Sequence, residues 1–202
     1  MRALRRVVVV AAKPPAVGKS RLAVPEVVRR ELATAFALDV LGAAEQASGV
    51  DEVVLMTTDQ ELAETYSGTS LADPAPGDLN NSLARAATLV RADVVVALLA
   101  DLPALRSAEL AGALEEAQDQ PAYVADAVGT GTTCHVAPMG SFTPRFGQGS
   151  AAAHTAAGAA ALTGDWPGLR TDVDDLASLQ RVLELGVGPH TARVLADHTP
   201  LP

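Results

Sequence analysis

The stretch that decides the fold is residues 7–22, VVVVAAKPPAVGKSRL, in which a short β-branched run passes directly into a loop containing proline and glycine. Such a run is typical of a buried parallel strand. The loop contains Lys13 and Lys19, the only two lysines of the chain, together with Arg21. Ligands of open α/β sheets bind just beyond the carboxyl ends of the strands, so this basic loop indicates a site for a polyanion.

The segment Gly18-Lys19-Ser20 ends like a Walker A phosphate-binding loop. That motif requires another glycine five residues before Gly18, and this chain has Lys13 there. The P-loop interpretation therefore fails on the spacing of its own motif. A solvated basic loop without a ligand stays open as the alternative.

The length and composition of the chain limit its class. Its 202 residues are 49% hydrophobic and carry a formal net charge of −9. This length and hydrophobic content predict one folded domain spanning residues 1–202 and exclude a disordered chain. The negative charge argues against a nucleic-acid partner, which requires a basic surface.

The single cysteine and the N-terminal residues bear on the cellular compartment. Cys134 lies within an apolar strand pattern and has no second cysteine to pair with, so we expect a buried, unreactive thiol. The apolar run near the N-terminus is too short for a signal peptide or a membrane span. We therefore expect a cytoplasmic protein without a membrane partner.

Strand-like and helix-like patterns alternate along the chain, and this alternation predicts the fold class. Such alternation is typical of an α/β fold, here a single domain with a mostly parallel central sheet flanked by helices. We expect strands at residues 7–12, 53–57, 94–99, 122–126 and 132–137, and helices at about 25–48, 83–90, 151–162, 175–185 and 190–197.

Carboxylates follow two of the extended segments. Asp101 comes just after the apolar strand at 94–99, and Asp172 and Asp174 are separated by one residue. In an extended segment, residues i and i+2 point to the same face. Oxygen ligands from one or two carboxylates suit Mg²⁺, so these three aspartates predict a Mg²⁺ site. The alternative is that Asp172, Asp174 and Asp175 cap the helix that follows.

A glycine-rich segment at residues 145–150, RFGQGS, leads into the expected helix from 151. We expect Ser150 to be the N-cap, and Gly147 and Gly149 to let the backbone turn sharply and leave the amide groups at the helix N-terminus free. Together with the hydroxyl of Thr132, those amides would bind a carboxylate or phosphate of a small acid. His154, one turn into the helix, would touch the same anion or serve a structural role. An ordinary glycine-rich start of a helix is the alternative.

Taken together, these segments resemble the guanylyltransferases of coenzyme F420 biosynthesis, relatives of the molybdenum-cofactor and sugar nucleotidyltransferases with the GT-A-type, Rossmann-like α/β fold. The resemblance lies in Lys13–Leu22, Asp73–Asn80, Leu98–Leu105, Asp126–Thr133, Arg145–His154 and Leu169–Leu176. It implies an enzyme that joins the phosphate of phosphoenolpyruvate, or of 2-phospho-L-lactate, to the GMP part of GTP and releases pyrophosphate. The next enzyme of the pathway is the implied functional partner.

The resemblance also implies roles for individual residues, and one motif departs slightly from the family's pattern. The implied sets are Thr132, Gly147 and Ser150 for the acid, Asp101, Asp172 and Asp174 for Mg²⁺, and Lys13, Lys19, Arg21 and Asn80 for the nucleotide, with Lys13, Lys19, Arg21 and Asp101 taking part in catalysis. The family's Ala-Lys-Ser-Arg-Leu is Gly-Lys-Ser-Arg-Leu in this chain.

Two other functions, and the choice between the two acids, stay open at the level of sequence. A molybdopterin or sugar nucleotidyltransferase would share the basic loop and the carboxylates, but would have no use for the small-acid pocket. A GTP-binding module would bind the nucleotide without turnover. Between the two acids, the arginine-rich and lysine-poor composition favours phosphoenolpyruvate, because that composition is typical of the actinobacterial lineages in which the family is expected to use it.

Overall fold

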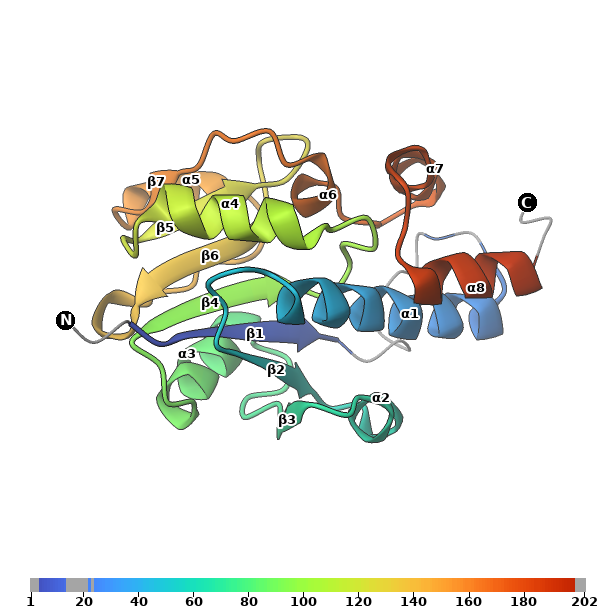
Figure 1. The fold of residues 1–202 in the computed structure, drawn as a ribbon, viewed down its shortest axis with the longest axis horizontal. Helices are drawn as coiled ribbons and strands as arrows, with labels where there is room; N and C mark the ends of the chain where they lie inside the picture. Colours follow the sequence, from blue (N-terminus) through green and yellow to red (C-terminus); the bar gives the residue numbers. More distant parts are fainter. Residues whose placement is uncertain (1–3, 14–21, 23, 199–202) are drawn as a thin grey trace.

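The computed structural model describes residues 4–13, 22 and 24–198, and a seven-stranded sheet runs through them (Figure 1). The strands are β1 (Arg6–Ala12), β2 (Glu52–Thr57), β3 (Thr69–Ala72), β4 (Val94–Leu99), β5 (Ala122–Ala125), β6 (Thr132–Pro138) and β7 (Ala160–Ala161). The helices are α1 (Glu26–Glu45), α2 (Gln60–Thr65), α3 (Leu79–Leu89), α4 (Ser107–Ala117), α5 (Ser150–Ala156), α6 (Pro167–Arg170), α7 (Leu176–Leu185) and α8 (Pro189–Asp197), with a short 3₁₀ helix η1 (Met139–Ser141).

The sheet has the strand order β3-β2-β1-β4-β6-β5-β7, and all but one of its strands run in the same direction. Only β6 is antiparallel to its neighbours, β4 and β5. The short turn between β5 and β6 explains this reversal, since a hairpin connection is too short to return the chain for parallel pairing. The mostly parallel α/β sheet predicted from the sequence is therefore confirmed.

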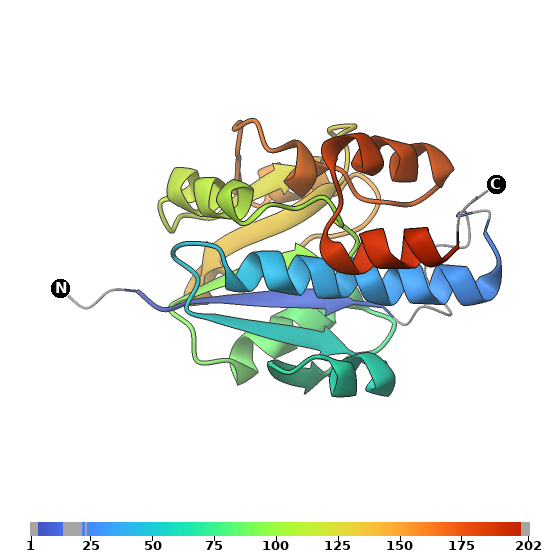
Figure 2. The same ribbon diagram turned by 45° about the vertical axis from the view of Figure 1, so that its right-hand side comes forward.

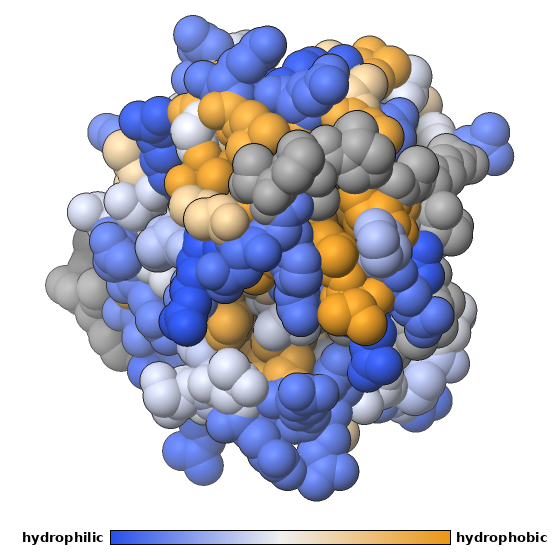
Figure 3. Space-filling view, turned by 90° about the vertical axis from the view of Figure 1, so that its right-hand side faces the viewer, coloured by the Kyte–Doolittle hydropathy of each residue, from blue (hydrophilic) through white to orange (hydrophobic). Residues whose placement is uncertain are grey.

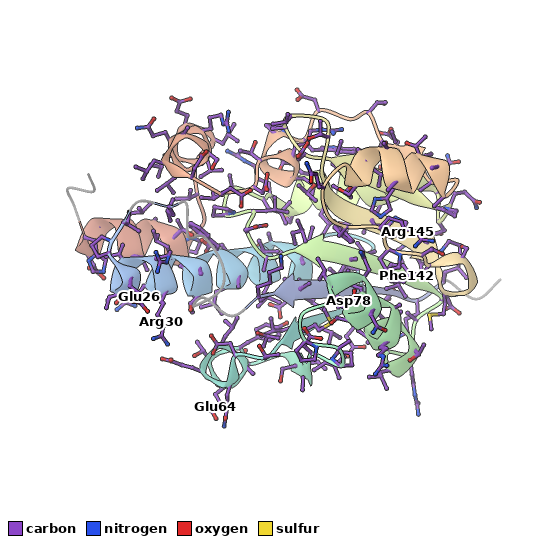
Figure 4. All side chains as sticks on the ribbon, turned by 180° about the vertical axis from the view of Figure 1, so that it is seen from behind. Glu26, Arg30, Glu64, Asp78, Phe142 and Arg145 are labelled. Carbon is purple, nitrogen blue, oxygen red and sulfur yellow. The ribbon has the colours of Figure 1, made fainter. Side chains whose placement is uncertain are left out.

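Helices cover both faces of the sheet because alternate residues of each strand point in opposite directions. Val8 and Val10 of β1 share one apolar cluster with residues of α1 and α4. Val9 and Ala11 share a second cluster with residues of α3 on the opposite face, which Figure 4 shows from behind. The β-branched run that opens the chain is thus buried on both sides, as its composition predicts.

The helix expected at residues 151–162 ends earlier than predicted. In the structure α5 stops at Ala156, and Gly158 takes a positive φ of 89°. The amides of Gly158 and Ala159 then donate to Thr155 and His154 and close the helix. The chain continues into β7, which pairs with the edge of β5. Alanine's high helix propensity suggested a longer helix, and the glycine turn overrides it.

The C-terminal helix α8 lies along α1 (Figure 2) and is capped by a side chain from it. Asp39, buried in the middle of α1, accepts hydrogen bonds from the amides of His190 and Thr191, both at 2.9 Å. The helix has no cap from its own N-cap residue, Gly188. A Cβ at Gly188 would collide with Asp39, so the close approach of the two helices requires glycine there.

Among the described residues, no helix is both long enough and apolar enough to cross a membrane.

Replacing Asp39 with alanine should lower the free energy of unfolding by about 2 kcal/mol, because two amides at the start of α8 lose a charged acceptor. Urea denaturation would measure the loss. Glu184→Ala, an exposed acid on α7, is the matched control and should leave the stability within about 0.5 kcal/mol of wild type. Equal stability of both variants would contradict the cap.

Candidate active site

Three carboxylates meet at the edge of the sheet where β4 ends. Oxygen atoms of Asp101, Asp172 and Asp174 all lie within 4.8 Å of one another. A backbone hydrogen bond aligns them: the amide of Val173 donates to the carbonyl of Asp101 at 3.0 Å. Since Val173 lies between Asp172 and Asp174 in the sequence, this bond holds the two flanking carboxylates against Asp101. The structure thus brings together the three aspartates that the sequence singled out.

The segment that carries Asp172 is fixed from two sides. The Thr133 hydroxyl on β6 donates to the carbonyl of Leu169 at 2.7 Å, and the buried Glu109 carboxylate accepts from the amide of Gly168 at 2.9 Å. A Cβ at Gly168 would collide with the carbonyl of Ala104, in the loop that follows Asp101. The close contact of α6 with this loop therefore depends on glycine at position 168.

The structure separates the capping aspartate from the other two. The Asp175 carboxylate accepts from the amide of Ser178 at 2.8 Å and is the N-cap of α7. That hydrogen bond is the main reason why the pKa of Asp175 lies below its ordinary value. Asp174 instead places its carboxylate in the cluster with Asp101. The helix-capping alternative is thus correct for Asp175 only, and the remaining carboxylates form an all-oxygen donor set that suits a hard divalent cation.

Lys13 emerges beside the carboxylates. Strands β1 and β4 are parallel neighbours in which Ala11 pairs with Leu99. Lys13 and Asp101 each lie two residues beyond that pair, so both leave the sheet at the same edge. Figure 3 looks onto this edge and shows hydrophilic side chains across its middle with apolar ones between them. Lys19 and Arg21, the other predicted nucleotide-binding cations, lie outside the described residues.

The predicted acid-binding residues gather at the beginning of β6 and of α5. Because β6 is antiparallel to β4, with Cys134 paired to Leu98, its first residue, Thr132, lies at the edge where β4 ends. Thr132 and Ser150 are buried, and Gly147 has the φ of 132° that glycine tolerates best.

The expected capping of α5 is wrong in one respect. Gly149, in the left-handed conformation, is the N-cap, and Ser150 is the first helical residue. The amide of Ser150 donates to Gly147, and the amide of Ala151 donates to Thr130, both at 3.1 Å. These two amides were expected to be free and instead have partners within the protein. The adjacent glycine accounts for the difference, since it takes the left-handed cap position that serine disfavours.

Two side chains hold the loop before α5 in place. His154, fully buried, accepts a hydrogen bond at Nε2 from the amide of Arg145 at 3.0 Å. Asn80, at the start of α3, accepts from the amide of Phe146 at 2.7 Å and donates to its carbonyl at 2.9 Å. Figure 4 places Arg145 and Phe142 on the face of the sheet that α3 covers. The sequence offered no signal for the contact between Asn80 and Phe146, and a role of Asn80 toward the nucleotide stays a prediction.

Burial keeps two residues of β6, Cys134 and His135, in their neutral forms. Burial raises the pKa of the Cys134 thiol to about 12, which confirms the expected unreactive cysteine. His135 stacks on Phe142, with ring centroids 5.3 Å apart, and lies 4.5 Å from the ring of His154. Burial, reinforced by His154 and opposed by the hydrogen bond to Ala122, lowers the pKa of His135 to about 4.

Comparison with known proteins identifies the family of this chain. The family model described as "Guanylyl transferase CofC like" matches residues 6–162. The chain belongs to this family. A phosphoenolpyruvate guanylyltransferase of Salinispora arenicola is 43% identical to this CofC-like chain over 203 residues, covering 96% of it and 94% of the relative. One from Mycolicibacterium gilvum is 40% identical over 200 residues, covering 93% and 94%.

The fold of this CofC-like chain also occurs among solved structures. A Desulfovibrio desulfuricans protein, provisionally described as a nucleotide-diphospho-sugar transferase, superposes with a TM-score of 0.72. The superposition covers 95% of this chain and 94% of the other, at 20% sequence identity. The likeness at this identity concerns the fold, and it confirms the nucleotidyltransferase-like architecture that the resemblance implied.

Asp172→Asn should weaken binding of Mn²⁺, a probe for Mg²⁺ sites, by at least about tenfold, because it removes one charged oxygen donor. Isothermal titration calorimetry would measure the affinity. Asp175→Asn is the matched control, since that residue caps α7, and its affinity for Mn²⁺ should stay within twofold of wild type. Equal weakening in both variants would contradict the division of roles between the two aspartates.

The stability of the protein should fall as the pH drops from 6.5 to 4. The folded state keeps His135 neutral down to about pH 4, while the unfolded chain binds a proton near pH 6.5. The stability is therefore complete above pH 6.5, and this one residue contributes a loss of about 3 kcal/mol by pH 4. Urea denaturation of wild type and His135→Phe at both pH values would isolate the effect. An identical pH dependence in the two proteins would contradict it.

Proposed function

We propose that this protein transfers GMP from GTP to phosphoenolpyruvate, giving enolpyruvyl-diphospho-5'-guanosine and pyrophosphate, in coenzyme F420 biosynthesis. The observation that carries the proposal is the placement of Asp101, Asp172 and Asp174 beside Lys13, in a chain whose relatives are named phosphoenolpyruvate guanylyltransferases. A single domain, residues 1–202, would perform the reaction in the cytoplasm, and the next enzyme of the pathway would take up the product.

The reaction needs no nucleophile from the protein. An oxygen of the phosphate of phosphoenolpyruvate forms a bond to the α-phosphorus of GTP, and the bond from this phosphorus to the bridging oxygen of the β-phosphate breaks. The electron pair of that bond leaves with pyrophosphate. The attacking phosphate is ionised at neutral pH, so the protein's task is to align two anions and offset their charge. The inert thiol of Cys134 is consistent with this chemistry.

Three groups of residues would share this task, together with Asn80. Lys13, Lys19 and Arg21 would bind the triphosphate, and Asp101, Asp172 and Asp174 would hold Mg²⁺. When bound, Mg²⁺ would neutralise charge on the reacting phosphates and orient them. Thr132, Gly147 and Ser150 would bind the acid, and Asn80 would lie near the nucleotide while it holds the loop at Phe146.

The competing functions differ in the products that they release. With 2-phospho-L-lactate as acceptor, pyrophosphate appears with that acid and not with phosphoenolpyruvate. A molybdopterin or sugar nucleotidyltransferase would release pyrophosphate only with its own acceptor. A GTP-binding module would release none. Incubation with GTP, Mg²⁺ and each acid, with the product identified by mass, separates these cases.

We expect pyrophosphate release with GTP and phosphoenolpyruvate, and a product mass equal to the acid plus GMP. Lys13→Met should lower kcat/KM for GTP about a hundredfold, because a cation facing the triphosphate is lost. Arg91 is an exposed cation just before β4, at the opposite edge of the sheet. Arg91→Met is therefore the matched control and should act like wild type. Turnover with 2-phospho-L-lactate alone, or no pyrophosphate with either acid, would overturn the proposal.

A further inference from the structure

We infer that His154 is a positioning residue that aligns the acid-binding groups of this enzyme. The inference rests on the proposed function and extends it to a residue that binds no substrate itself. His154 lies on α5, and its imidazole reaches the beginning of β6, the loop before α5 and the first residue of α5. These are the segments that carry Thr132, Gly147 and Ser150.

The contacts of the ring join these segments directly. Nδ1 lies 2.9 Å from the carbonyl of Ser150 and 3.1 Å from the hydroxyl oxygen of Thr132. On the other side of the ring, Nε2 lies 3.0 Å from the amide nitrogen of Arg145, two residues before Gly147. One imidazole thus sets the distance between β6 and the glycine-rich loop.

The hydrogen bonds fix the tautomer of His154. A backbone amide can only donate, so Nε2 accepts from Arg145 and carries no proton. The neutral ring must then carry its proton on Nδ1, where the carbonyl of Ser150 and the oxygen of Thr132 face it. Because the Thr132 oxygen accepts on this side, its own hydrogen stays available for another acceptor, such as an oxygen of the acid.

The surroundings of the ring hold it rigidly and in the neutral form. His154 is fully buried and stacks on Tyr123 of β5, with its centroid 5.5 Å away, while the ring of Phe146 packs edge-on at 5.4 Å. Burial, opposed by the hydrogen bond to Ser150 and reinforced by the charge of Arg145, lowers the pKa of His154. The titratable rings that contact it are those of Tyr123 on β5 and His135 on β6.

The position of His154 predicts an effect on one substrate only. Its hydrogen bonds reach the segments that carry the proposed acid-binding residues. Lys13 and Asp101 instead follow β1 and β4, and Asp172 and Asp174 follow α6. Loss of the imidazole should therefore misplace the acid without disturbing GTP. A residue with a merely structural role would lower stability and leave the two KM values in the same ratio.

Three variants test this inference. His154→Phe keeps a stacked ring but loses both hydrogen-bonding nitrogens, and His154→Gln keeps an acceptor near the position of Nε2. His135→Phe is the matched control, because His135 is a second buried and stacked histidine that hydrogen-bonds to the carbonyl of Ala122 and not to the acid pocket. The KM for phosphoenolpyruvate, the KM for GTP and kcat would be measured for each variant, with circular dichroism to establish folding.

We expect His154→Phe to raise the KM for phosphoenolpyruvate about tenfold or more, the effect of losing roughly one hydrogen bond, and to leave the KM for GTP within twofold. His154→Gln should recover part of the loss, and His135→Phe should match wild type. Trypsin should also cleave after Arg145 faster in His154→Phe than in His135→Phe, because the amide of Arg145 is released.

The outcomes separate this inference from the proposed function. An unchanged KM for the acid in His154→Phe, or an equal rise for both substrates, overturns the inference while wild-type turnover still supports the function. If His154→Phe does not fold, His154→Gln decides, and a KM for the acid equal to wild type with unchanged cleavage at Arg145 overturns the inference. If wild type releases no pyrophosphate with either acid, the proposed function fails, and the acid-positioning role of His154 fails with it.

Discussion

The candidate site depends on one backbone hydrogen bond, from the amide of Val173 to the carbonyl of Asp101. It places three like charges within 4.8 Å of one another, an arrangement that repels itself in the absence of a cation. Hydrogen bonds outside the cluster must therefore hold the three aspartates in place. The hydroxyl of Thr133 and the carboxylate of Glu109 do so, since each anchors α6 through a buried hydrogen bond.

The reversed strand β6 joins the two halves of the site. In a fully parallel sheet every strand would end at the same edge, and the beginning of each strand would lie at the opposite one. Because β6 runs the other way, its first residue, Thr132, lies beside the end of β4 and close to the carboxylates. The residues proposed to bind the small acid and those proposed to hold the cation therefore share one edge, as the joining of two phosphates would require.

The central strands and the carboxylate cluster could be predicted from the sequence because both follow from local rules. Apolar runs mark buried strands, and the spacing of Asp172 and Asp174 puts them on one face. Hydrogen bonds between the side chain of one segment and the backbone of a distant one could not be predicted. The clamp of Asn80 on Phe146 joins residues 66 positions apart, and Asp39 caps a helix that begins 150 residues later. The choice of Gly149 over Ser150 as N-cap depends on a backbone angle that composition leaves open.

The cap that Asp39 provides for α8 ties the C-terminal helix to the rest of the fold. The family match stops at residue 162, before Asp172, Asp174 and α8. The amide of Gly188 also donates to the carbonyl of Pro103, so the start of α8 is tied to the loop that follows Asp101. A recombinant fragment trimmed to the family match would lack two of the three carboxylates, and Asp39 would lose both of its amide donors from α8. The residues after 162 are therefore an integral part of the fold and carry two of the three clustered carboxylates.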